Sequence, residues 1–116
     1  MGLSFKEQAP FARVREELFG DDEGFRAFQN ALMAHPRFGD VIQGTGGGAR
    51  KIRWSDPQRG KGKRSGIHVI YYLHEPSREV LLLFAYDKNT PDLTSEEKKA
   101  IRTQIEAYRQ EKEAQA

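Results

Sequence analysis

The chain has 116 residues, enough for one compact domain and too few for a second core, because domains typically run to about 100–150 residues. Its seven Phe, four Tyr and one Trp argue against a disordered chain, and the absence of Cys excludes both a disulfide framework and a thiolate metal site. The formal net charge is only +2, no run approaches the roughly 18 apolar residues of a membrane span, and the first residues lack the apolar region of a signal peptide, so we expect a cytoplasmic protein with no membrane partner.

Two apolar series at helical spacing mark the first third of the chain. Apolar residues recur every three or four positions over residues 11–19, and again over residues 25–33 after a Gly-Asp-Asp break. Asp21 or Asp22 can cap the second helix, and His35, which precedes a proline, ends it. These signals predict a helical hairpin.

A glycine-rich turn leads into a strand whose two faces differ. Residues 44–48 contain four glycines, which predicts a flexible turn. It is not a phosphate-binding loop, because Lys51 lacks the required spacing and a strand follows. Over residues 50–54 the side chains alternate as in a strand, so Lys51 and Arg53 share one face, while Arg50 and the apolar members share the other.

The excess positive charge is confined to one segment. Residues 49–68 carry seven basic groups and one acidic group, whereas residues 1–48 carry five and seven, and residues 69–116 carry seven and nine. A basic segment on an otherwise acidic chain is typical of a polyanion-binding surface. We interpret residues 55–66 as a mobile hairpin loop. The basic residues expected to contact nucleic acid are Arg50, Arg59, Lys61, Lys63 and Arg64.

Two further strands and a helix follow the basic loop. Residues 67–74 are rich in β-branched and aromatic side chains, and residues 80–86 are apolar on both faces, so we expect the second of these strands to be central and covered on both sides. The Thr-Ser-Glu-Glu sequence at residues 94–97 matches a helix capping box. An apolar stripe then occupies residues 101–108, and the tail after about residue 110 is expected to fray.

These signals predict the order helix, helix, three antiparallel strands, helix, with a short strand over Leu3–Lys6 only weakly indicated. That order defines an α+β fold, in which an N-terminal helical hairpin packs on a small antiparallel β-sheet with a C-terminal helix. The sequence contains no internal repeat, so residues 1–116 are expected to form a single domain.

Lys51 and Arg53 are the first candidates for chemistry. Cleavage of RNA by internal attack of a 2′-hydroxyl requires a group that takes the hydroxyl proton, positive charge on the developing phosphorane and a donor for the leaving oxygen. Lys and Arg can bind the phosphate and stabilise its charge, and a lysine crowded by other cations loses its proton more readily. Alternatively, the pair is a solvated strand face.

His68, Tyr86 and Lys88 are further candidates at strand ends. His68 directly follows the basic loop, and an imidazole that titrates at about 6.5 is the usual general acid or base at neutral pH. Tyr86 could donate a proton or stack on a base, and Lys88 could bind phosphate. The alternatives are a packed histidine, and a Tyr86 that closes the core ahead of a turn. No spacing of His, Asp and Glu suggests a metal site.

Several motifs, in one order, resemble the HigB branch of the RelE/ParE toxins. The likeness runs from about Phe11 to Tyr108. It rests on GDVIQGTGG from residue 39, RKIR from residue 50, GKGKRSG from residue 60, VIYY from residue 69, LL at residues 82 and 83, and YDKN from residue 86.

The resemblance implies the toxin of a type II toxin–antitoxin pair, with a RelE-like fold and an antitoxin partner that often carries a helix-turn-helix. Active relatives enter the ribosomal A site and inhibit translation by cleaving the bound messenger RNA, with scattered Lys, Arg and Tyr side chains and with no metal or cofactor. By position, the catalytic residues of these relatives correspond to Lys51, Arg53, Tyr86 and Lys88 in this sequence. The neighbouring basic residues would then contact RNA and the ribosome.

The chain departs from the family pattern in three places. Gly48-Ala49 stands where one leucine is expected, His68 stands where an arginine is common, and Asp87 stands where a small residue is common. Two alternatives share the fold. One is a ParE-like toxin that poisons gyrase without cutting RNA, against which the retained basic pair and Tyr86 argue. The other is a non-catalytic module that binds RNA or the ribosome.

Overall fold

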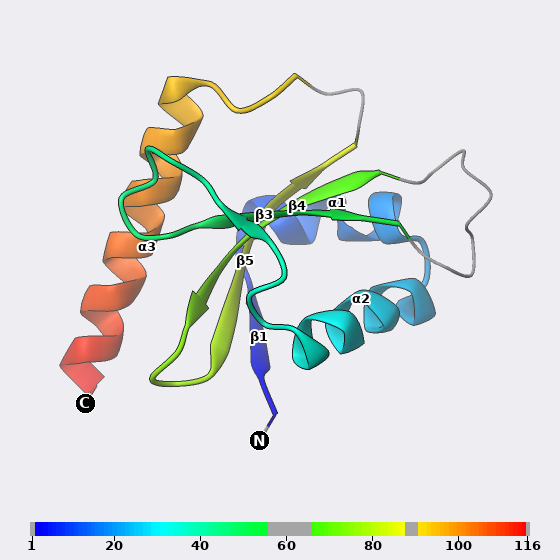
Figure 1. Ribbon diagram of the computed structural model, residues 1–116, viewed down its shortest axis with the longest axis horizontal. Helices are drawn as coiled ribbons and strands as arrows, with labels where there is room; N and C mark the ends of the chain where they lie inside the picture. Colours follow the sequence, from blue (N-terminus) through cyan, green and yellow to red (C-terminus); the bar gives the residue numbers. More distant parts are fainter. Residues whose placement is uncertain (1, 56–65, 88–90, 116) are drawn as a thin grey trace.

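A computed structural model describes residues 2–55, 66–87 and 91–115. Within these ranges the chain forms three helices and five strands, which confirms the α+β class (Figure 1). In chain order the elements are β1 (Ser4–Glu7), α1 (Ala9–Phe19), α2 (Asp22–Ala34), β2 (Asp40–Val41), β3 (Arg50–Trp54), β4 (Ile67–His74), β5 (Glu79–Tyr86) and α3 (Ser95–Gln115).

The five strands form one mixed sheet in the order β1-β5-β4-β3-β2. Strands β2 to β5 pair antiparallel, but β1 pairs parallel to β5. The weakly indicated strand over Leu3–Lys6 is present as β1 and precedes both helices. The predicted antiparallel sheet is wrong, because the parallel pairing of β1 with β5 makes the sheet mixed. The sequence of the four-residue β1 gives only a weak strand signal, because the strand forms by pairing with the edge of β5. Beside this edge, the Ser4 amide donates to the Arg78 carbonyl at 3.0 Å.

One face of the sheet packs against α1 and α2. Five aromatic rings form the centre of this first core, and neighbouring centroids lie 5.3 to 6.4 Å apart. The rings belong to Phe11, Phe19, Phe25, Phe28 and Trp54. The apolar residues whose spacing predicted the two helices thus form the helix faces that pack against the sheet.

The other face of the sheet packs against α3. The predicted apolar stripe of this helix is buried through Ile101, Ile105 and Tyr108. The helix continues to Gln115, in place of the frayed tail expected after about residue 110, and Lys112 pairs with Glu79 at 3.2 Å. In Figure 1, α3 lies to the left of the strands, whereas α1 lies behind them and α2 to the right.

The helix starts follow the sequence signals. Asp21, one of the two proposed caps, accepts from the Gly24 amide at 3.0 Å. Before α3, Thr94 Oγ1 accepts from the Glu97 amide at 3.1 Å and Glu97 Oε1 accepts from the Thr94 amide at 2.8 Å, so the predicted capping box is confirmed. None of the helices in the described ranges combines the length and apolarity needed to cross a bilayer.

The glycine-rich segment 44–48 packs against α3 and is more than a connecting turn. A Cβ at Gly46 would lie 2.4 Å from the Arg102 side chain, and one at Gly47 would lie 2.9 Å from Ile105. Arg109 donates to the Gly47 carbonyl at 3.2 Å. The small residues therefore allow this loop to approach the helix that covers the second core.

Tyr71 ties the segment after α2 to the sheet. Its hydroxyl accepts from the Gly39 amide at 2.8 Å and donates to the Pro36 carbonyl at 3.0 Å, in a fully buried position. Tyr71→Phe leaves both groups without this partner and is expected to lower the free energy of unfolding by about 1–3 kcal/mol. Urea denaturation measures the change. Tyr72→Phe, which removes one bond to Arg109, serves as the control and should cost less. Equal losses would contradict the larger contribution expected of the two Tyr71 bonds.

Candidate nucleic-acid interface

Three adjacent strands bring the predicted site residues into one row on the sheet. Arg53 of β3 lies opposite His68 of β4, and His68 lies opposite Tyr86 of β5. Lys51 lies two residues before Arg53 on the same face of β3, as the alternation predicts. The row lies on the α3 side of the sheet, because Tyr86 belongs to the core cluster that α3 covers.

A β-bulge places Tyr86 on this face. Ile70 lies opposite Phe84 while Tyr71 lies opposite Leu82, so β5 holds one residue more than β4 at this point. Without the extra residue, strict alternation from Leu82 would put Tyr86 on the face turned to α1 and α2. The bulge was not predicted, because an uninterrupted apolar run shows no break where the register changes.

His68 and Tyr86 form a stacked pair of rings. Their centroids are 5.0 Å apart and their planes are inclined by 8°. His68 Nδ1 and the Tyr86 hydroxyl are buried and have no hydrogen-bond partner among the described residues. Buried polar atoms of this kind are uncommon, and at a site they are candidates to meet a ligand. Tyr86 is 6% exposed, so it closes the core as one of its two interpretations had it.

The charges around the stacked pair act on its two members in different ways. Burial lowers the pKa of His68 below its ordinary value of 6.5, and the cations of Lys51 and Arg53 lower it further, against an opposing effect of Asp92. Burial raises the pKa of Tyr86, and the carboxylates of Asp92 and Glu97 add to the rise. At neutral pH the pair is thus a neutral imidazole, able to accept a proton, beside a protonated phenol.

Asp92 is a site residue that the sequence did not reveal. It lies in the connection before α3, where its Oδ1 accepts from the Leu93 amide at 3.0 Å and from Lys51 Nζ at 3.3 Å. The Leu93 bond and then Lys51 hold the pKa of this exposed carboxyl below its usual range. Its carboxylate therefore meets the Lys51 ammonium where a phosphate oxygen could bind instead.

The other predicted basic residues are not all brought to this row. Arg50 lies on the opposite face of β3 and donates to the Gly39 carbonyl at 2.7 Å, so it braces the segment after α2. The structure therefore does not group Arg50 with Lys51 and Arg53. The remaining predicted site residues lie outside the described residues; they are Arg59, Lys61, Lys63, Arg64 and Lys88.

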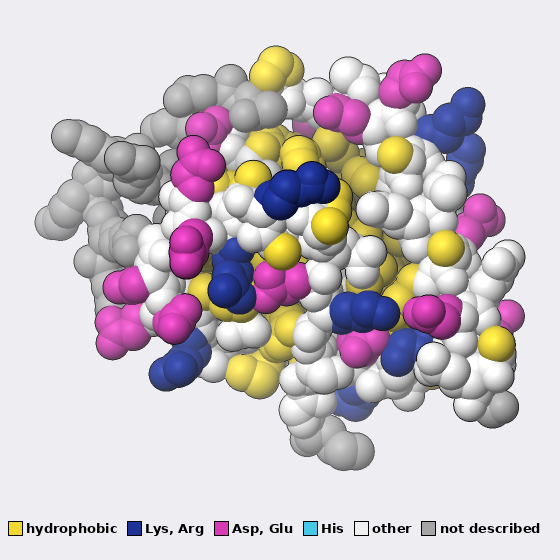
Figure 2. Space-filling view, turned by 180° about the vertical axis from the view of Figure 1, so that it is seen from behind, with side chains coloured by type: hydrophobic (Ala, Val, Ile, Leu, Met, Phe, Trp, Pro, Cys, Tyr) yellow, Lys and Arg dark blue, Asp and Glu magenta, His cyan; other side chains and the backbone are white. Residues whose placement is uncertain are grey.

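Figure 2 shows the face of the molecule that is turned away from the viewer in Figure 1, and its charges are mixed. Basic and acidic side chains alternate there between hydrophobic ones, and no broad patch of one sign is visible (Figure 2). Such a surface offers a phosphate chain no continuous cationic path. Figure 2 therefore shows no candidate polyanion-binding surface on the part of this face that is described.

Comparison with known protein families identifies none: no family model matches the chain. Within the part of the chain that the structure describes, no group of three His, Cys, Asp or Glu side chains could hold a metal ion.

The electrostatics of the row predict opposite responses to two substitutions. Lys51→Met removes a cation and is expected to raise the pKa of His68, whereas Asp92→Asn removes an anion and is expected to lower it. An NMR titration of the imidazole signals measures both changes. Arg13→Met, on the exposed outer side of α1, controls for a general loss of positive charge. Shifts of the same sign in both site variants would contradict this arrangement of charges.

Proposed function

We propose that the protein is a toxin of the RelE/HigB type, which inhibits translation by cutting messenger RNA on the ribosome. The observation that carries the proposal is the row of Lys51, Arg53, His68 and Tyr86 across three adjacent strands. These residues come from separate parts of the sequence, and together they supply the three groups that cleavage by a 2′-hydroxyl requires. The sequence resemblance, which implies a RelE-like fold, supports the same function.

In the proposed reaction Lys51 and Arg53 bind the scissile phosphate and stabilise the charge of the phosphorane. His68, neutral because its pKa is lowered, accepts the proton of the 2′-hydroxyl as the 2′ oxygen bonds to phosphorus. The bond from phosphorus to the 5′ oxygen breaks, and this oxygen takes the proton of the Tyr86 hydroxyl. The products are a 2′,3′-cyclic phosphate and a 5′-hydroxyl, and solvent restores the proton states of His68 and Tyr86. No step uses a metal or cofactor.

The proposal includes the partners that the resemblance implies. They are the ribosome with its messenger RNA, and an antitoxin protein that neutralises the toxin and often carries a helix-turn-helix. The protein would act in the cytoplasm, because its substrate is the translating ribosome.

Binding of RNA or the ribosome without cleavage is the second candidate function. The observation that favours it is the burial of the Tyr86 hydroxyl, which is covered in the described conformation and must be uncovered before it can protonate a leaving oxygen. Both candidates require phosphate contacts and therefore a strong dependence on salt. They differ only in whether the RNA chain is cut.

Controlled expression in bacteria, followed by primer extension on a translated transcript, tests the proposal. We expect growth arrest and new RNA ends associated with codons, and both should disappear when Lys51 and Arg53 are replaced by alanine. Growth arrest with intact messages would favour the binding function or gyrase poisoning. New ends that persist in the double variant would assign the cleavage to another nuclease.

A further inference from the structure

The stretch of chain from the end of α2 through β2 exposes large hydrophobic side chains. In the described part of the chain, the large hydrophobic residues with exposed side chains are Met33, Phe38 and Val41, at 42%, 52% and 55%. All three lie within nine consecutive positions, with Met33 in the last turn of α2, Phe38 in the connection and Val41 in β2. Exposed apolar groups that gather in one region mark interaction surfaces more often than isolated ones do.

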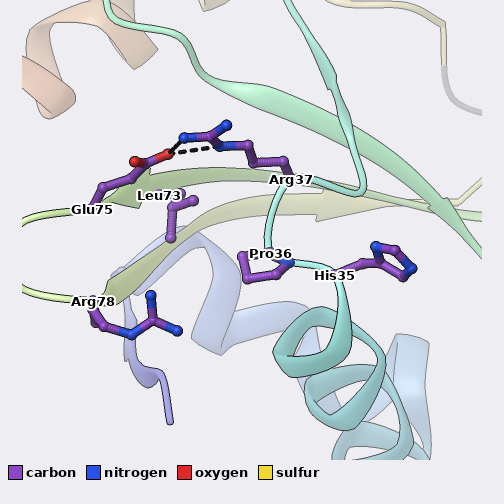
Figure 3. A pocket seen from close by; sticks show the side chains of 6 residues that line it. All are labelled: His35, Pro36, Arg37, Leu73, Glu75 and Arg78. Atoms are coloured by element: carbon purple, nitrogen blue, oxygen red, sulfur yellow. Dashed lines mark hydrogen bonds and ion pairs between the residues drawn. The ribbon is translucent and has the colours of Figure 1, made fainter. Parts of the chain in front are cut away.

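A pocket of about 360 Å³ lies beside this segment, and Figure 3 shows the side chains that line it. Leu73 and Pro36 provide apolar surface. Arg37 lies on one side, where its Nε donates to Glu75 Oε2 at 2.7 Å, and the Arg78 guanidinium approaches from the other side. The pocket therefore combines apolar surface with two guanidinium groups and one carboxylate.

Arg78 occupies a backbone conformation that disfavours its side chain. Arg78 lies in the turn between β4 and β5 and has a φ of 53°. Among the described residues other than glycine, it is the one with a positive φ. Glycine adopts this conformation without a steric penalty, whereas arginine is strained there. Strain of this kind persists where the surrounding structure holds the residue in place, and here the Arg78 amide donates to the Glu75 carbonyl at 3.1 Å. The Arg78 side chain lines the pocket, and its Nε donates to the Gly2 carbonyl at 3.4 Å.

The pocket continues toward the free edge of the sheet. β2 is the last strand in the sheet order, so its outer side has no neighbouring strand among the described residues. Val41 of β2 lines a second hollow, of about 290 Å³, which shares Leu73 and Glu75 with the first. An extended chain that filled both hollows would pass over Leu73 and Glu75, which line both of them.

We propose that this surface, formed by Arg37, Phe38, Val41, Leu73 and Arg78, binds an extended segment of a protein partner in which acidic side chains alternate with apolar ones. The partner carboxylate would meet the two arginines, which can serve more than one acceptor each, and its apolar side chains would cover Phe38, Val41 and Leu73. A peptide fits better than a nucleic acid, because the exposed side chains of Phe38 and Val41 are apolar and a phosphate chain has no apolar side chains to cover them.

The surface lies at the other end of β4 from the candidate nucleic-acid interface. His74 lies six positions after His68, which corresponds to about 20 Å along a strand. The inference extends the proposed function by giving its protein partner a binding surface, but it does not require that the protein cut RNA.

NMR titration of the ¹⁵N-labelled full chain tests the inference. The probe is the peptide acetyl-Leu-Glu-Leu-Glu-Leu-amide, and the controls are the same peptide with Gln for Glu and a short single-stranded RNA. We expect saturable shifts confined to residues 37–41 and 73–78, with affinity for the Glu peptide at least about 5-fold above that for the Gln peptide.

Arg78→Gly separates binding from folding. Glycine relieves the backbone strain, so the melting temperature should stay the same or rise, while binding of the Glu peptide should be lost. Arg26→Ala, at an exposed position of α2, is the matched loss of one positive charge and should bind normally.

Absent or non-saturable shifts, equal binding of the Gln peptide, or normal binding by Arg78→Gly would overturn the inference. RNA that shifts the same signals as strongly would identify a nucleic-acid surface instead. If the protein binds the peptide but leaves transcripts intact, the peptide-binding surface is supported and the proposed nuclease function is contradicted.

Discussion

Replacing both Lys51 and Arg53 with alanine is expected to reduce cleavage of ribosome-bound messenger RNA by at least about 100-fold. The reason is that removal of one group that stabilises transition-state charge typically costs about 10²–10³ in rate. The two cations share one face of β3, beside His68. The third basic residue of β3, Arg50, lies on the opposite face and cannot replace them.

Binding of RNA should weaken in the same variant. A non-cleavable 2′-O-methyl oligonucleotide separates binding from chemistry, and its affinity is measured over a range of salt concentrations. Each lost phosphate contact should reduce the slope of log affinity against log salt by about 0.7 for a single strand. Arg13→Ala with Arg26→Ala removes the same charge from exposed positions of α1 and α2 and is the control. A site variant that behaves like this control would exclude the β3 pair from RNA binding.

His68→Gln is expected to reduce the cleavage rate by about 10²–10⁴, the range attributed to general acid–base catalysis. Affinity for the non-cleavable oligonucleotide should change little, because neutral glutamine replaces an imidazole that is itself neutral at pH 7. His74→Gln, at the opposite end of β4, is the control and should cleave normally. Full cleavage by His68→Gln would contradict the assigned base.

The pH dependence of cleavage gives the same prediction a second measurement. Because burial and the cations of Lys51 and Arg53 lower the pKa of His68 below 6.5, the imidazole loses its proton on the acidic side of that value. The wild-type rate should therefore rise with pH below 6.5 and level off above it. His68→Gln should lack this rise, and so should His68→Arg, which introduces the arginine common in the toxins that the sequence resembles. An unchanged acidic limb in both variants would assign the titration to another group.

The outcomes of these two experiments separate the candidate functions. Loss of RNA binding in the β3 double variant, with normal behaviour of His68→Gln and intact messages, describes a protein that binds RNA without cutting it. Loss of cleavage in both variants, with binding lost only in the first, describes the proposed nuclease. The distinction depends on His68, one of the three places at which the chain departs from the pattern of the toxins that it resembles.

The sequence by itself determined those features that repeat over a short stretch of chain. The strand at residues 50–54 was predicted from alternation, and with it the common face of Lys51 and Arg53, because neighbours in an extended chain point to opposite sides wherever the strand lies. The capping box at residues 94–97 was predicted for the same reason, since both of its hydrogen bonds join residues three apart. The buried stripe of α3 follows equally from the period of a helix.

Only the tertiary structure decided which of these local faces meet. The register of β4 against β5, with its bulge beside Phe84, puts Tyr86 against His68, and a shift of one residue would have separated them. Asp92 reaches Lys51 across 41 positions of sequence. The parallel pairing of β1 is decided in the same way, by a partner near the other end of the chain. Local periodicity carries no information on such distant pairings, so the basic pair found from the sequence became a candidate site only when the fold set His68, Tyr86 and Asp92 around it.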